Sequence, residues 1–209
     1  MFGWLTNIMS TALEFINGFV HNYGISIIIF TIFIKLLLYP MTAKQTKSMR
    51  QMQELQPEVE KLQKKYKDNK EKQQQEVMKL YQDKNVSMAA GCLPMILTMI
   101  IIIPLYRAIF DLDMSGSAFL WIQNLAEPDI PLLILNVIAM IAQTYLMQKQ
   151  QGSKGQSNFM MWIFPFFILF IGFQLPAGVL IYWLAQTLIT LIQNYIIYND
   201  PELKGAAAE

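Results

Sequence analysis

Long apolar runs alternate with polar segments along this chain of 209 residues. Five of the runs are long enough to cross the ~30 Å hydrocarbon core of a bilayer, which takes about 20 helical residues at ~1.5 Å each. The predicted spans are Tyr23 to Ala43, Ala89 to Phe110, Ile130 to Met147, Phe159 to Leu175 and Ala177 to Tyr198. The pattern therefore predicts an all-α membrane protein with five transmembrane helices.

The first segment, residues 1–22, has a different pattern. Its apolar residues recur on one side of a helix, with polar residues opposite. This stripe contains Leu5, Ile8, Met9, Ala12, Leu13 and Ile16. Because the basic region that opens a signal peptide is missing, we expect an amphipathic helix at the membrane interface, anchored by Phe2 and Trp4. The alternative is a leader that is cleaved or partly disordered.

A polar segment, residues 44–88, separates the first two spans. Apolar residues recur there at alternating intervals of three and four, as in a helix that packs on another helix. They are Met52, Leu55, Val59, Leu62 and Tyr66, with a second apolar edge at Val77, Leu80 and Tyr81. We predict a two-helix hairpin, in which Pro57 marks either a kink or the start of a new helix. The alternative is a charged, solvated linker.

The distribution of basic residues predicts the orientation. Eleven of the sixteen Lys and Arg residues lie between Lys44 and Lys84, whereas the loop 111–129 has none and carries four acids. Because basic loops stay in the cytoplasm, we expect the N-terminus outside, and the hairpin, the loop 148–158 and the tail 199–209 inside. The charge pattern alone does not name the membrane.

Composition argues against several kinds of chemistry. The chain has one cysteine, Cys92, and one histidine, His21, which excludes disulfide frameworks and Cys/His metal sites. The formal net charge is +1, so no strong overall field attracts nucleic acid. We found no phosphate-binding Gly-rich loop. We therefore expect no catalytic residue, no metal and no cofactor, and a protein that is not an enzyme.

Lys35 is the most informative residue, because it lies within the first apolar run. About eight residues, or roughly 12 Å of rise, separate it from the predicted cytoplasmic edge at Ala43, and a lysine side chain reaches only about half as far. The other predicted spans offer it no acidic partner. Such a lysine should face water or a substrate. The alternative is a lysine without a role near a thinned membrane edge.

Polar residues in three other spans support a polar cavity. Thr31, Tyr39 and Thr42 share the Lys35 side of the first span, and Thr98 lies in the second. Asn136 and Gln143 lie on the third, and the fifth adds Tyr182, Gln186, Thr190, Gln193 and Asn194. This arrangement favours a half-lined groove over a closed pore. Alternatively, such residues hydrogen-bond between helices without forming a site.

The order of these parts resembles the YidC family of membrane protein insertases, in its short bacterial form. The resemblance rests on four motifs, which are Leu38-Tyr39-Pro40 followed by Lys44 to Met49, Leu55 to Glu58 leading to Lys64-Lys65-Tyr66, Ala90 to Pro94, and Leu175 to Trp183. It implies a five-helix core in the bacterial cytoplasmic (plasma) membrane, a groove open to the cytoplasm and to lipid, and a mobile hairpin. It also implies that a basic residue in the first span attracts acidic residues of the substrate. Lys35 stands where bacterial members usually carry Arg, and Thr98 stands where a groove Gln is common, an amide that Gln143 is placed to replace.

The resemblance and the polar pattern together predict a substrate-binding groove. Its candidate residues are Lys35, Thr31, Tyr39, Thr98, Gln143, Tyr182, Trp183, Gln186 and Gln193. The expected function is to move short hydrophilic tails of nascent membrane proteins across the membrane and to release their apolar helices into lipid. The expected partners of the hairpin are the ribosome, the signal recognition particle receptor and the Sec translocon. The alternatives are a small secondary transporter or channel that uses the same groove, and a scaffold that acts only through the hairpin.

Overall fold

The computed structural model describes residues 3–84, 86, 93–112, 114, 116–151 and 168–199. The helices with named bounds are α1 (Gly3–Val20), α2 (Tyr23–Leu37), α3 (Tyr39–Glu54), α4 (Gln56–Lys65), α5 (Lys70–Asp83), α6 (Leu93–Asp111), α7 (Ile130–Gln151) and α9 (Ala177–Asn199). Residues 168–172 are also helical. The described residues form no β-strand, only an isolated bridge between Phe119 and Ile122. The all-α prediction is confirmed for this part of the chain.

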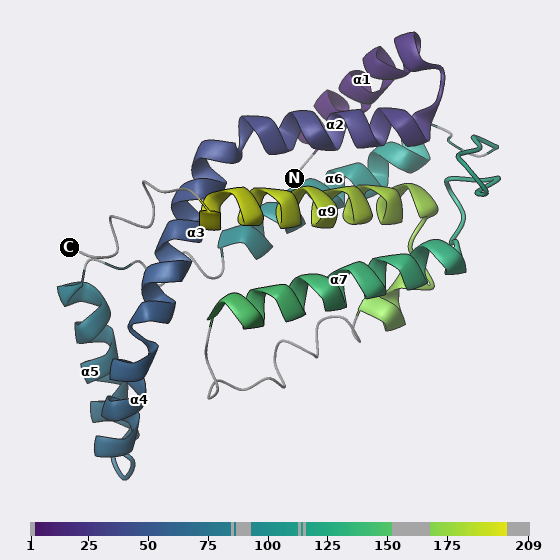
Figure 1. Cartoon of the computed structure of the whole chain (residues 1–209). Coiled ribbons are helices and arrows are strands. Elements are labelled where there is room, and N and C mark those ends of the chain that lie inside the picture. The colour runs from purple at the N-terminus through teal and green to yellow at the C-terminus, as the bar shows by residue number, and fades with distance from the viewer. Residues whose placement is uncertain are drawn as a thin grey trace.

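Within the described residues, the main bundle consists of α1, α2, α6, α7 and α9 (Figure 1). Helix α2 packs against α9 and α1, α9 also packs against α7, and α1 packs against α6. Side chains from all five helices meet in one apolar cluster, whose fully buried members include Leu13, Ile27, Leu105, Leu133 and Leu180. Between helices in lipid, such close packing provides van der Waals contact that holds the bundle together. The bundle fixes the positions of α2 and α9, which carry most of the candidate site.

Helix α1 is part of the bundle as well as amphipathic. Met9 and Leu13, from the predicted stripe, are buried against the cluster. Ile8 was placed on the same stripe, but its side chain is 55% exposed. Successive residues of a helix point about 100° apart, so Ile8 lies at the margin of the face that Met9 buries. The predicted position of α1 at a membrane interface stays a prediction.

A bend interrupts the segment Tyr23 to Ala43, which the sequence pattern predicts as one straight helix. Helix α2 ends at Leu37, and α3 leaves it at an angle of 62°. Pro40 is the physical reason, because it has no N–H and its ring clashes with the carbonyl group four residues earlier. As a result, the rise along the α2 axis from Lys35 to Ala43 is smaller than the roughly 12 Å of a straight helix.

Helices α4 and α5 form a pair that extends from α3, away from the main bundle (Figure 1). The pair has its own apolar cluster, with Leu55, Val59, Tyr81 and Val86 buried. Helix α4 begins at Gln56 with a proline in its first turn, so the structure shows the second of the two readings of Pro57. The side chain of Asn69 accepts a hydrogen bond from the backbone of Lys72 and caps α5. That the pair lies in the cytoplasm stays a prediction.

The loop between α6 and α7 folds over one end of the bundle. Met114, Ile122 and Leu125 are buried in the main cluster. The backbone nitrogen of Ala177 donates to the carbonyl oxygen of Glu127 at 2.7 Å, and that of Gly178 donates to Leu125 at 2.9 Å. The first N–H groups of a helix have no partner within it, so the loop satisfies the start of α9. This end of the bundle is therefore covered by the chain itself.

Length and composition identify few spans in the described part of the chain. One helix, Ala177–Ile197, is long and apolar enough to cross a membrane, and the bent pair α2 and α3 would be a second if taken as one span. The apolar helices Ile100–Ile109 and Ile130–Leu146 are shorter. Much of the predicted span Phe159 to Leu175 and the start of Ala89 to Phe110 lie outside the described residues. The count of five spans stays a prediction.

Candidate functional site

The side chain of Lys35 joins α2 to α9. Its Nζ donates a hydrogen bond to Oγ1 of Thr190 at 2.9 Å. The Thr190 hydroxyl in turn donates to the backbone oxygen of Gln186 at 2.7 Å, one turn earlier on α9. Nε2 of Gln193 donates to the backbone oxygen of Lys35 at 3.3 Å. These three bonds form a polar seam between α2 and α9, which we call the Lys35 seam.

The charge of Lys35 has no counter-ion in the seam. Within the described residues, no carboxylate oxygen lies within 4.0 Å of its Nζ, and the ion pair found there joins Arg50 and Glu54 on α3. A lysine ammonium has three donors, and Thr190 accepts one of them. Lys35 is only partly buried. The ammonium group can therefore still donate to an acceptor that approaches from outside the bundle.

Two of the predicted groove residues lie in the packed interior. Thr31 is buried, and its hydroxyl donates to the backbone oxygen of Ile27 at 2.6 Å, within its own helix. Tyr182 is also buried and belongs to the main apolar cluster. A threonine hydroxyl commonly bonds the carbonyl group of the preceding turn in a helix, which satisfies the group without a ligand. Both side chains are thus packed within the bundle in this structure, and their contribution to a groove stays a prediction.

The other predicted residues differ in placement. Gln193 is buried in the Lys35 seam, and Gln186 contributes its backbone oxygen to it. Trp183 is half-buried on α9, and Tyr39 is half-buried at the bend. Gln143 is half-buried on α7. The side chain of Thr98 lies outside the described residues.

Asn136 is the polar residue that joins α7 to α9. It is buried, and its Nδ2 donates to the backbone oxygens of Leu132 at 2.9 Å and Leu180 at 3.1 Å. Here the alternative reading, a hydrogen bond between helices, is what the structure shows. A weaker contact joins α3 to α9, where Thr46 Oγ1 lies 3.5 Å from Asn194 Oδ1.

Sequence reasoning placed Thr190 on the polar stripe of α9 but left it out of the candidate groove. The signal was its spacing, four residues after Gln186 and three before Gln193, which places all three on one side of the helix. That Thr190 rather than a glutamine side chain accepts from Lys35 depends on the rotation of α9 about its axis. The spacing along the chain does not contain this information.

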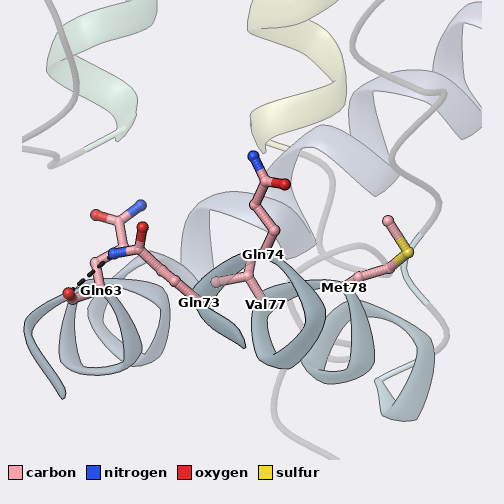
Figure 2. A pocket seen from close by; sticks show the side chains of 5 residues that line it. All are labelled: Gln63, Gln73, Gln74, Val77 and Met78. Atoms are coloured by element: carbon pink, nitrogen blue, oxygen red, sulfur yellow. Dashed lines mark hydrogen bonds between the residues drawn. The ribbon is translucent and has the colours of Figure 1, made fainter. Parts of the chain in front are cut away.

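A hollow of about 390 Å³ lies elsewhere, in the pair of α4 and α5 (Figure 2). It is lined by Gln63, Gln73, Gln74, Val77 and Met78. Nε2 of Gln73 donates to the backbone oxygen of Gln63 at 2.9 Å, which ties the two helices together. The lining is uncharged, so this hollow is a separate feature from the Lys35 seam.

Long apolar helices that are joined by polar side chains are typical of helical membrane proteins. Residues 15–204 match the family model described as 60Kd inner membrane protein, and the chain belongs to this family. Its relatives include proteins named membrane protein insertase YidC. One from Caldanaerobacter subterraneus subsp. tengcongensis is 40% identical over 92% of this chain and 94% of its own length. One from Fusobacterium nucleatum is 38% identical over 97% of this chain and 99% of its own length.

Other relatives are longer than this chain. The protein of the same name from Syntrophus aciditrophicus is 40% identical over 93% of this chain but only 36% of its own length. A solved structure, described as an active YidC insertase with its first transmembrane domain resolved, matches with a TM-score of 0.70. It is 29% identical, and the match covers 95% of this chain and 47% of that one. The resemblance inferred from the sequence motifs is confirmed.

Proposed function

We propose that this protein is a membrane protein insertase that works through a hydrated groove at the Lys35 seam. It moves short hydrophilic tails of substrate proteins across the membrane and releases their apolar helices into lipid. The relatives named insertase support the function. The observation that carries the mechanism is the Lys35 ammonium, which is bonded to a neutral hydroxyl and has no carboxylate within 4.0 Å among the described residues.

The physical task is to lower the cost of moving polar groups through hydrocarbon, where each charge costs several kcal/mol. A carboxylate in the substrate tail forms a charge-assisted bond with Lys35, which is roughly twice as strong as a neutral one. Thr190 offers Lys35 only a hydroxyl oxygen, so an arriving Asp or Glu is the better partner. The pairing is transient, and the apolar part of the substrate then moves sideways into lipid.

Two buried polar atoms support the presence of water within the bundle, one in the Lys35 seam and one between α7 and α9. Gln193 Oε1 and Asn136 Oδ1 are buried, and neither has a hydrogen-bond partner among the described residues. Buried polar atoms in proteins are nearly always bonded, to water where no protein group is available. Gln193 also holds the backbone of Lys35. We infer that water enters the bundle at least as far as these two amides.

The orientation follows from the basic residues. Because most of them lie between Lys44 and Lys84, the pair α4 and α5 lies in the cytoplasm, and so does the C-terminus, in a bacterial plasma membrane crossed five times. The pair extends away from the main bundle (Figure 1). We expect it to contact the ribosome, the signal recognition particle receptor or the Sec translocon.

Reconstitution tests the function. The purified chain in liposomes is given a short single-span substrate with an acidic tail, and the tail is tested for protection from protease. We expect protection only in vesicles that contain the protein, and less for a matched tail in which the acids are Asn and Gln. Equal protection in empty vesicles would contradict the proposal. A solute flux through the protein without insertion would favour the transporter or channel, which the named relatives do not favour.

A further inference from the structure

A tight turn at residues 119–122 projects from the loop between α6 and α7. The backbones of Phe119 and Ile122 exchange two hydrogen bonds, of 2.8 and 2.9 Å, so Leu120 and Trp121 occupy the tip. Leu120 has a φ of +54°. This left-handed conformation is unfavourable for a residue with a bulky side chain and favours glycine or asparagine. A leucine in such a position suggests a use for its side chain.

The turn is held rigidly by its neighbours. Phe119 packs so closely on α2 that a Cβ atom at Gly24 would overlap its ring. Nδ2 of Asn22, the residue that caps α2, donates to the backbone oxygen of Ala118 at 3.1 Å. Trp121 Nε1 donates to Asp129 at 3.2 Å, directly before α7. The turn is therefore fixed to the N-terminal ends of two helices.

The tip displays apolar surface although its base is packed. Leu120 is 75% exposed and Trp121 is 51% exposed, whereas Ile122 is buried. The indole nitrogen is the only polar atom of the Trp121 side chain, and Asp129 already satisfies it. The exposed part of the ring thus has no need of water, and it can enter an apolar medium without losing a hydrogen bond.

We propose that Leu120 and Trp121 form a lipid anchor that enters the boundary between headgroups and acyl chains. The surroundings of the turn favour lipid as the occupant. An exposed apolar row on α2 begins next to Gly24 and consists of Ile25, Ile29, Ile32, Phe33, Leu36 and Leu37. At the corner between α1 and α2, Phe15 and Phe19 are exposed and in edge contact. The tip therefore continues the apolar surface of α2. Tryptophan is enriched at the boundary between headgroups and acyl chains in membrane proteins, which agrees with Trp121 at the tip.

The arrangement in the fold agrees with this. Figure 1 shows the corner between α1 and α2, this loop, and the starts of α7 and α9 at one end of the molecule. The loop 111–129 has no basic residue and four acids, so anionic headgroups do not attract it. The anchor therefore acts through apolar contact and does not require anionic lipid. That it enters the outer leaflet rests on the orientation proposed above, but the insertion itself does not.

Fluorescence quenching tests the anchor directly. Trp4, Trp162 and Trp183 are replaced by phenylalanine, and the full chain is placed in phosphatidylcholine vesicles. Lipids brominated near the start of their acyl chains should quench Trp121, and aqueous iodide should quench it about twofold less than a control tryptophan in water. The control is Gln123→Trp in a chain that also carries Trp121→Phe, because Gln123 is exposed two residues further on. Adding anionic lipid should leave the result unchanged.

The proposal would be overturned if iodide quenched Trp121 as strongly as it quenches the control tryptophan and brominated lipid had no effect on Trp121. That result would leave a protein partner as the occupant of the tip. Leu120→Asn gives a second test, because asparagine tolerates the left-handed backbone. We expect weaker lipid quenching of Trp121 and an unchanged melting temperature in detergent. A lower melting temperature with unchanged lipid quenching would show that Leu120 serves packing instead. None of these readouts requires insertase activity, so the anchor can fail while the proposed function stands.

Discussion

The ammonium nitrogen of Lys35 lies 2.9 Å from the hydroxyl oxygen of Thr190, which is 155 residues further along the chain. A threonine hydroxyl can accept from a lysine and donate at the same time, and here it donates a hydrogen bond to the backbone oxygen of Gln186. The charge is thus oriented by a neutral group. A hydrogen bond to a charged group contributes about 1.5–3 kcal/mol when it is buried. An incoming carboxylate can replace this bond and adds the attraction between two opposite charges.

Reversing the charge of residue 35 should abolish insertion. We expect Lys35→Glu to lose insertion of acidic-tailed substrates, because the tail then meets a like charge within the membrane, and Lys35→Arg to retain it. Protease protection in proteoliposomes measures both. A basic-tailed substrate serves as the control, since it should be inserted better by Lys35→Glu than an acidic-tailed one. Equal activity of the two variants would remove Lys35 from the mechanism.

Removing the hydroxyl group of Thr190 should destabilise the bundle. Thr190→Val leaves the Lys35 ammonium without its acceptor, and Thr190→Ser should cost little. For Thr190→Val we expect a loss of about 1–2 kcal/mol in unfolding free energy, toward the low end of the range for a bond to a charged group because Lys35 is only partly buried. Thermal unfolding in detergent gives the comparison. If serine and valine were equally harmful, the methyl group rather than the hydroxyl would matter.

Asn136 and Gln143 lie two turns apart on α7 and should behave differently. Asn136→Ala removes the bond to Leu180, and we expect a cost of about 0.5–2 kcal/mol in stability with insertion retained at a temperature where the variant is folded. Gln143→Ala, at a half-buried position, should leave stability unchanged and reduce insertion. Thermal unfolding and insertion, measured for both variants, test whether Asn136 serves stability and Gln143 serves insertion. If the two variants changed insertion to the same extent, the predicted difference between the two residues would be wrong.

Two glycines provide a matched test of the packing between α2 and the loop. Gly24→Ala forces a methyl group into the Phe119 ring and should destabilise the protein by about 1–3 kcal/mol. At Gly18, in α1, a Cβ atom meets nothing within 4 Å, so Gly18→Ala should be neutral or stabilise by up to about 1 kcal/mol. The melting temperature of Gly24→Ala should fall, and that of Gly18→Ala should stay the same or rise.

Separating α4 from α5 should distinguish an insertase from a scaffold. Val59 is buried between the two helices, so Val59→Asp should unpair them and raise amide hydrogen exchange over residues 56–83. We expect insertion of a short acidic tail in ribosome-free liposomes to persist, because the Lys35 seam is elsewhere. Complete loss of insertion would favour the scaffold. Gln75→Glu, at an exposed position on α5, adds the same negative charge without burying it and is the control for the altered charge.

The apolar pattern predicted the long helices well. The predicted segment Ala177 to Tyr198 corresponds to α9, which covers Ala177–Asn199. The pattern missed the bend after Leu37, because the run stays apolar through it and Pro40 was not weighed as a break. Lys35 was singled out because a charge in an apolar run is rare, and that it faces water or a substrate stays a prediction. Thr190, its hydrogen-bond partner, was not predicted, because the residue of α9 that faces Lys35 depends on how α2 and α9 pack.

The bonds from Ala177 and Gly178 to the loop carbonyls also determine when the molecule is complete. Glu127 and Leu125 are synthesised well before α9, and their carbonyl groups must bind water until that helix arrives. The same helix then brings Thr190 to Lys35. The Lys35 seam therefore forms together with the bonds between the loop and the start of α9. A chain truncated before residue 177 would have neither set of contacts.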